Sequence, residues 1–333
     1  MKQTWLIILK LIGVLLTALG LLALYYAPLE LGTFYIFSEG GSAAYPGFQV
    51  GTPWFALLLL MNMGYYVLAA LCLPLGIGHF LLRGWAFKLA RLISWFWLGW
   101  GVLLLGNGLL LLPAIARVNT SYRLLPWQNA LLTAVALLVL LVLPALAVWF
   151  YHSRGVTQCF VDHGSSAGWL ERVSFRRLSL LGMYTCLLFW LHISIFLQGM
   201  FPFFGHMEFD RTGIRWIGGC VLITCVLIYG TARNLPWARW GGILFSGLLS
   251  LSAGLTFASL NFYELVSMLK VPAYEMNLIQ EASVLHNLPL VGLFLPPLLM
   301  MLFLAAGLQP EQAPVFPPVT PDESSPSVQI MTS

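Results

Sequence analysis

The sequence predicts an all-α integral membrane protein, an eight-span transmembrane helix bundle built from two parallel four-helix repeats with both termini in the cytoplasm. Three observations support this fold class. Hydrophobic residues make up 59% of the 333-residue chain and charged residues only 8%, whereas soluble domains contain about 25% charged residues. Eight apolar stretches are long enough to cross a bilayer, and matching residues recur at a fixed distance along the chain. This composition excludes a soluble enzyme, a nucleic-acid-binding protein and a disordered scaffold.

Each expected span approaches or exceeds the roughly 20 apolar residues that a helix needs to cross the hydrocarbon core. The stretches are continuously apolar and do not alternate as membrane strands do. The first stretch follows Lys2 as in a signal peptide, but it is too long and lacks a clear cleavage site, so we interpret it as a retained span. The eight expected spans are Trp5–Ala27, Pro53–Leu82, Leu89–Ile115, Gln128–Tyr151, Leu178–Met200, Arg215–Ala232, Trp237–Leu260 and Leu285–Leu308.

The positive charges predict the orientation. Eleven of the 16 Lys and Arg residues lie on the side that carries the N-terminus when these spans are threaded in order. Because positive residues are enriched in cytoplasmic loops, we expect both ends of the chain in the cytoplasm. The short connections favour the cell membrane, specifically a bacterial inner membrane. Residues 309–333 are rich in Pro, Ser and acidic residues, which predicts a disordered cytoplasmic tail.

An internal repeat is indicated by residues of the same type that lie 152 positions apart. Four spans per repeat is an even number, so the two repeats would share one orientation, as in some transporters. A duplicated scaffold without transport is the alternative. We expect a first repeat at 1–153, a cytoplasmic linker at 154–177 and a second repeat at 178–308. The matched residues are Gly78 and Gly230, Trp85 and Trp237, Ala86 and Ala238, Ser94 and Ser246, Gln128 and Gln280, and Pro144 and Pro296.

No cofactor is indicated by the chain. Its five cysteines lack the spacing of a zinc site, its formal net charge is only +4, and the glycine-rich segment before Pro53 does not match a phosphate loop. We therefore expect no nucleic acid and no nucleotide as partners. The expected partners are the lipid bilayer and other membrane protein subunits.

Polar residues within the expected spans are candidates for lining a cavity. Asn62, Asn107 and His192 are the clearest of them, and an ionisable residue inside a membrane is a candidate functional residue. His192 could equally form a hydrogen bond between helices. No expected span has an acidic residue near its centre, which argues against a proton- or sodium-coupled carrier.

The outer loops contain further candidates. The long first outer loop carries Glu30 and Glu39 and could form an ordered cap. The matching loop of the second half places His206, Glu208 and Asp210 at alternate positions, so an extended backbone would point all three side chains one way. An imidazole and two carboxylates could bind a divalent metal, although solvated polar residues are common in such loops.

Three functions follow from these observations, in decreasing order. The first is a non-catalytic scaffold or subunit of a membrane complex. The second is a transporter or lipid-handling protein with a path at the repeat interface. The third is a membrane enzyme that uses the outer His/Glu/Asp cluster, or Cys159 with His163 in the expected linker, where an imidazole could generate a thiolate.

Overall fold

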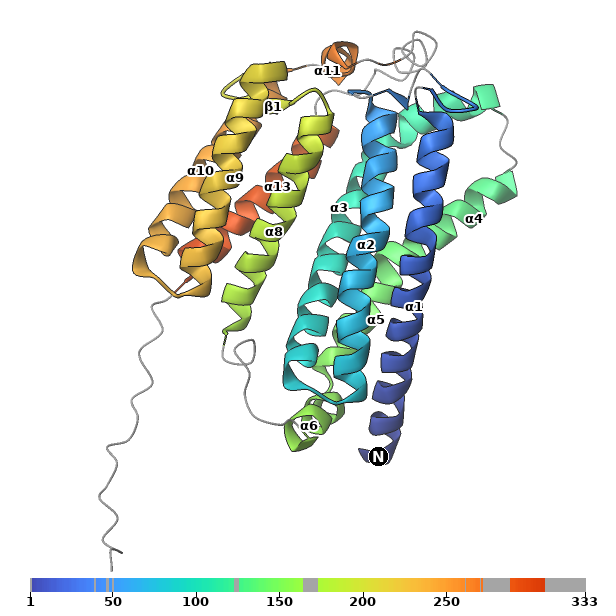
Figure 1. Ribbon diagram of the computed structural model, residues 1–333, viewed down its shortest axis with the longest axis vertical. Helices are drawn as coiled ribbons and strands as arrows, with labels where there is room; N and C mark the ends of the chain where they lie inside the picture. Colours follow the sequence, from blue (N-terminus) through green and yellow to red (C-terminus); the bar gives the residue numbers. More distant parts are fainter. Residues whose placement is uncertain are drawn as a thin grey trace, which may run out of the picture.

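The structure is a computed structural model that describes residues 2–38, 40–45, 48–49, 51–122, 126–163, 173–260, 262–269, 271 and 288–308. Its described part is helical apart from one short hairpin. Two groups of helices stand side by side, one from each half of the chain (Figure 1).

The first group contains three long helices, α1, α2 and α3, and a fourth segment that is divided into α4, η2 and α5. Helices α1 and α2 pack along each other, and α3 packs against α5. A π-helical turn, η2, separates α4 from α5, and the short α6 lies at the end of the bundle that carries the N-terminus (Figure 1). The elements are α1 (Lys2–Phe37), α2 (Pro53–Phe80), α3 (Gly84–Tyr122), α4 (Pro126–Leu137), η2 (Leu138–Val142), α5 (Leu143–His152) and α6 (Arg154–His163).

The second group contains four long helices, with α13 packed along α10 and α8 packed along α9. The hairpin and α11 lie at the end opposite to α6 (Figure 1). The elements are α8 (Phe175–Phe196), β1 (Phe201–Phe203), β2 (His206–Glu208), α9 (Asp210–Ala232), α10 (Pro236–Ser259), α11 (Phe262–Met268) and α13 (Leu288–Ala306).

Seven helices in the described part are long and apolar enough to cross a membrane, which confirms the prediction of a multi-span helical bundle. They begin within α1, α2, α3, α4, α8, α9 and α10 and coincide with the first seven expected spans. The eighth expected span corresponds to α13, whose apolar part, Val291–Ala306, is shorter.

The first helix is longer than the sequence predicts. It continues from Ala27 through Pro28 and Glu30 to Phe37, so Glu30 lies on α1 and not in a loop. Proline costs a helix one backbone hydrogen bond. Asn62 of α2 donates to the Ala27 carbonyl oxygen at 3.0 Å beside this proline, and bonds of this kind between neighbouring helices stabilise interrupted membrane helices.

Small residues allow α1 and α2 to approach closely. A Cβ atom at Gly76 would overlap Thr17 Oγ1 and would lie 2.7 Å from the Gly13 carbonyl oxygen. A similar contact joins α3 to the π-helical turn, because a Cβ atom at Gly101 would overlap the Leu140 carbonyl oxygen. Small residues at helix crossings are typical of membrane bundles, where van der Waals packing drives association.

The hairpin closes one end of the second group. Strand β1 pairs antiparallel with β2 through a two-residue turn at Phe204 and Gly205, which both have positive φ. Two hydroxyls of α10 hold this turn: Ser252 Oγ accepts from the Phe204 amide and Thr256 Oγ1 accepts from the Gly205 amide, both at 3.0 Å. The hairpin is therefore part of the bundle and not a free loop.

Two helix–helix turns have the same backbone geometry at positions 152 apart. In the α2–α3 turn, the Arg83 amide donates to the Gly78 carbonyl oxygen at 2.8 Å; in the α9–α10 turn, the Leu235 amide donates to the Gly230 carbonyl oxygen at 2.9 Å. A residue with positive φ precedes each donor, with φ of 52° in the first turn and 57° in the second. The ring of Trp85 covers Gly78 in the first turn.

In the second turn, the Trp237 ring lies over Gly230 in the same way. A Cβ atom added at Gly78 would lie 3.0 Å from the Trp85 ring, and one added at Gly230 would lie 2.5 Å from the Trp237 ring. Glycine at these two positions is therefore required by the tryptophan and alanine that follow it, because Ala86 Cβ would lie 2.5 Å and Ala238 Cβ 2.9 Å from the added atom.

Each group of helices has its own buried core. The first contains Leu9, Leu75 and Phe160, and the second is built around Tyr184 and Ile217. A small third cluster of Leu92, Val173 and Leu178 joins α3 of the first group to the start of α8. The contact between the groups is thus narrower than the packing within either group.

Candidate functional site

A large cavity lies between the two groups of helices. It measures about 680 Å³, within the range of about 300–1,000 Å³ that is typical of ligand sites. We call it the α3–α8–α13 groove after the helices that line it. Its residues include Trp95, Phe96, Gly99, Trp100, Val102, Phe175, Arg176, Ser179, Met183, Pro296, Pro297 and Met300.

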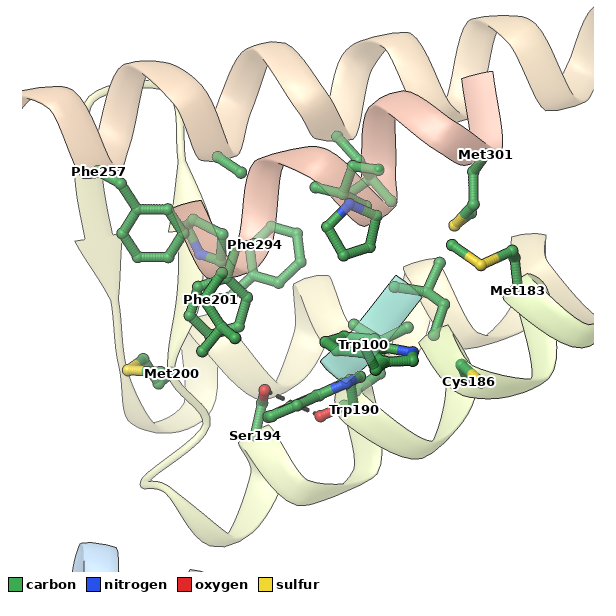
Figure 2. Close-up of a pocket in the computed structure, with 18 residues that line it drawn as sticks. Trp100, Met183, Cys186, Trp190, Ser194, Met200, Phe201, Phe257, Phe294 and Met301 are labelled. Carbon is green, nitrogen blue, oxygen red and sulfur yellow. Dashed lines mark hydrogen bonds between the residues drawn. The ribbon is translucent and has the colours of Figure 1, made fainter. Parts of the chain in front are cut away.

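A smaller pocket of about 110 Å³ adjoins this groove and shares Trp100, Met183 and Pro297 with it. Figure 2 shows aromatic rings and methionine sulfurs around this pocket. Trp190 lies beside Trp100 with ring centroids 6.5 Å apart, and Phe294 is 5.8 Å from Trp190. The aromatic wall therefore comes from three helices that are far apart in sequence.

Consecutive prolines shape the wall that α13 contributes. Pro296 and Pro297 both lie inside this helix, and both line the groove. Proline removes a backbone donor and clashes with the preceding turn, so it opens or bends a helix. We attribute the space between α13 and α3 to this pair.

The walls offer shape and apolar surface but few groups that could react. Ser179 Oγ donates to the Phe175 carbonyl oxygen at 2.9 Å, and Ser194 Oγ donates to the Trp190 carbonyl oxygen at 3.0 Å. Both hydroxyls are therefore committed to their own helices. Among the described residues, neither the groove nor the smaller pocket includes a His, Asp or Glu in its lining.

One charged residue marks one end of the groove. Arg176, in the first turn of α8, donates through Nη1 to the Gly307 carbonyl oxygen. Its guanidinium also lies 5.8 Å from the centre of the Phe303 ring, a distance suited to a cation–π interaction. The groove is thus apolar along its length and cationic at one end.

The three intramembrane candidates do not meet at this site. Asn62 bonds to the α1 backbone, as described above, and is 5% exposed. Asn107 Nδ2 donates to the Leu103 carbonyl oxygen at 2.8 Å, and His192 is exposed with Nδ1 2.6 Å from the Leu188 carbonyl oxygen. None of the three lines the groove or the smaller pocket, so a cavity formed by these residues remains a prediction.

Asn107 retains one feature of interest. Its Oδ1 is buried without a hydrogen-bond partner, and a Cβ atom at Gly292 of α13 would lie 2.9 Å from it. The asparagine therefore faces α13 across the boundary between the two groups of helices.

The outer candidates are only partly brought together. His206 Nε2 lies 3.0 Å from Glu208 Oε1, because both residues are on β2. The extended segment ends before Asp210, which has φ of 51° and begins α9, so the expectation that all three point one way is wrong. Among the residues that the structure describes, no three His, Cys, Asp or Glu side chains form a group that could hold a metal. The metal site remains a prediction without support from this geometry.

Three other candidates remain, and one of them lies outside the described residues. Glu30 is on α1, and Glu39 lies outside the described residues. Cys159 is 4% exposed and packs in the core of the first group, which gives no support to a reactive thiol.

The aromatic and methionine lining was not anticipated from the sequence. The helices that supply it are apolar on every side, so periodicity could not indicate which face of α3 or α8 meets the other half. The adjacent prolines of α13 were the one available signal, because two prolines inside an expected span predict a local opening. No family model matches the chain, and no curated protein or solved structure matches it either.

Proposed function

We propose that this chain is a non-catalytic, multi-pass membrane protein that binds the acyl chain of a membrane lipid in the α3–α8–α13 groove. One observation carries the proposal: a cavity of about 680 Å³ with almost wholly apolar walls lies between two separately packed groups of helices. Arg176 at one end could neutralise an anionic headgroup. This proposal develops the lipid-handling hypothesis, but the residues that line the groove differ from Asn62, Asn107 and His192, which the sequence suggested.

The test fills the groove without disturbing its walls. Gly99 lines the groove, and a Cβ atom added there would meet no heavy atom within 4 Å. We expect Gly99→Phe to occupy the cavity and to reduce labelling by a photoreactive phospholipid, with the diazirine in its acyl chain, by about fivefold or more, the scale of one lost apolar contact of about 1 kcal/mol.

The matched control is Gly218→Phe on α9. Gly218 is exposed and equally free of neighbours, but it does not line the groove. Labelling equal to that of the wild type is expected for this control. Equal labelling of Gly99→Phe and the wild type at the α3 and α13 peptides would contradict the proposal.

We also propose the finer topology: eight spans in two parallel repeats, with both termini in the cytoplasm of a cell. The matched α2–α3 and α9–α10 turns support a duplication. Helix α13 has 19 residues, which at a rise of about 1.5 Å per residue approaches the thickness of the hydrocarbon core. This length supports α13 as the eighth span.

A subunit role in a larger membrane complex is the second candidate. The segment from α4 to α5 is the least covered apolar span in the described part of the chain, and Trp127 and Trp149 on it are 60% and 68% exposed. Native mass spectrometry of gently solubilised membranes checks this role. A stoichiometric protein partner would support it, and a lone chain that retains lipid would favour the groove.

A further inference from the structure

A separate pocket lies where α9 turns into α10, and its lining is more polar than that of the groove. It measures about 120 Å³ and is lined by Arg177, Thr231, Asn234 and Arg239, together with the first turn of α10 and Leu308. Among the described residues, the lining contains two arginines and no acidic residue. A small cavity with this composition favours a compact anion.

Two polar atoms of residues in this lining are buried without a hydrogen-bond partner in the described part of the chain. They are Thr231 Oγ1 and Arg239 Nε, and Thr231 is only 2% exposed. Buried polar groups are nearly always satisfied, and an unsatisfied one costs roughly as much as a lost hydrogen bond. Two unsatisfied donors on residues that line one small cavity therefore favour a ligand that accepts hydrogen bonds.

The first turn of α10 adds a third feature. This helix has 24 residues, begins at Pro236 and has no side-chain hydrogen bond at its N-cap. The positive end of its helix dipole therefore has no side-chain cap, and such helix ends bind anions. Arg177 on α8 also lines this cavity. It carries a positive charge and is only 7% exposed.

The matching turn of the first half shows what a closed version looks like. At the positions 152 residues earlier, His79 replaces Thr231 and Phe87 replaces Arg239. His79 Nε2 is satisfied by the Tyr151 hydroxyl at 2.8 Å, and Phe160 of α6 packs 5.2 Å from the Phe87 ring. The two turns share one backbone geometry. Aromatic rings fill the α2–α3 turn, whereas the α9–α10 turn carries arginines and two polar atoms without hydrogen-bond partners.

We propose that the pocket at the α9–α10 turn binds a phosphate group. A phosphate accepts several hydrogen bonds at once, and Arg recognises it through its planar, forked donors. Trp237 and Trp240 lie near the start of α10, beside the turn, and are 43% and 67% exposed, which is typical of the headgroup level of a bilayer. The phosphate could belong to a lipid headgroup or to a soluble phosphate ester, and this site is independent of the apolar groove.

The experiment measures phosphate binding to the purified full-length chain at about 0.15 M salt, where long-range attraction is screened. One arm titrates inorganic phosphate in detergent. The other arm measures retention of phosphatidic acid against phosphatidylcholine in nanodiscs by mass spectrometry. Binding in the first arm identifies a soluble phosphate site, and preferential retention in the second arm alone identifies a headgroup site.

The variants remove single donors. We expect Arg239→Gln to weaken binding in the responding arm about tenfold, the scale of one hydrogen bond to a charged group. Arg233→Gln is the matched control, because Arg233 is an exposed cation on the same turn that does not line the pocket. Its affinity should stay within about twofold of the wild type, as expected for an exposed, screened charge.

Thr231→Val keeps the test valid if the arginine variant does not fold. Replacing an unsatisfied hydroxyl with a methyl group of similar shape should leave the melting temperature of the ligand-free protein unchanged or higher. The same variant should lose most of the rise in melting temperature that phosphate or phosphatidic acid gives the wild type. The proposal would be overturned if neither arm showed binding. It would also be overturned if Arg239→Gln and Thr231→Val kept the wild-type affinity, or if Arg233→Gln lost as much affinity as they do.

Discussion

Two buried tyrosines, one in each half of the chain, differ in whether their hydroxyls are satisfied. Tyr151 is 7% exposed and bonds to His79, which is fully buried. Tyr184 is fully buried, yet its hydroxyl has no hydrogen-bond partner. The two residues therefore form a natural matched pair for measuring what a buried hydroxyl contributes in this protein.

We expect Tyr151→Phe to lower the free energy of unfolding by about 1–3 kcal/mol, because it leaves the His79 ring nitrogen buried without its partner. Tyr184→Phe removes a hydroxyl that has no partner and should be neutral or slightly stabilising. Unfolding of both variants in a denaturing detergent, followed by circular dichroism, measures the difference. Equal losses in the two variants would show that the His79–Tyr151 bond contributes nothing specific.

The crossing of α1 and α2 offers a prediction at the scale of whole elements. Gly76→Ala places a methyl group against Thr17 and the Gly13 backbone, so α1 and α2 must shift apart at this crossing. We expect a loss of about 1–3 kcal/mol, typical of overpacking. Thermal unfolding in detergent, followed by intrinsic tryptophan fluorescence, measures this loss.

Gly64→Ala on the same helix is the control, because a Cβ atom there would meet no heavy atom within 4 Å. Alanine favours a helix by about 1 kcal/mol over glycine, so this control should be neutral or stabilised. If Gly76→Ala and Gly64→Ala lost stability equally, the close packing of α1 against α2 at Gly76 would not be the cause of the loss.

Hydropathy predicted where the helices lie but not how they end or what they face. The stretch Trp5–Ala27 stops in the sequence because Pro28 and Glu30 interrupt the apolar run, yet α1 continues to Phe37. The lipid-facing and protein-facing sides of α3 are both apolar, so nothing in the sequence singled out Trp100 as a wall of the groove.

The contact between α10 and the hairpin could have been predicted from the sequence. Ser252, Thr256 and Ser259 lie at spacings of four and three on α10 and all contact the hairpin turn. A stripe of hydroxyls on an apolar helix predicts a polar partner along that face. The alternation of His206, Glu208 and Asp210 was the weaker signal, because it assumed that the strand continued into the residue that starts α9.

At the scale of the whole molecule, the number of spans decides on which side the chain ends. Seven helices in the described part meet the length expected of a span, and the shorter apolar helix of α13 is the candidate for an eighth. If α13 crosses the membrane, the segments before α1 and after α13 lie on one side, and the α9–α10 turn with its phosphate pocket shares that side. If α13 lies within one leaflet, the tail emerges on the opposite side.

We expect eight crossings, because α13 packs along the full-length helix α10 and supplies Met301 and Ala305 to the buried core. Epitope tags placed at each end of the chain and in the hairpin turn, probed with protease in sealed vesicles of known orientation, measure this. Both terminal tags should be accessible from the face that carries positive charge, and the hairpin tag only from the other face. Terminal tags on opposite faces would reduce the bundle to seven spans and would remove the even count on which the parallel repeat depends.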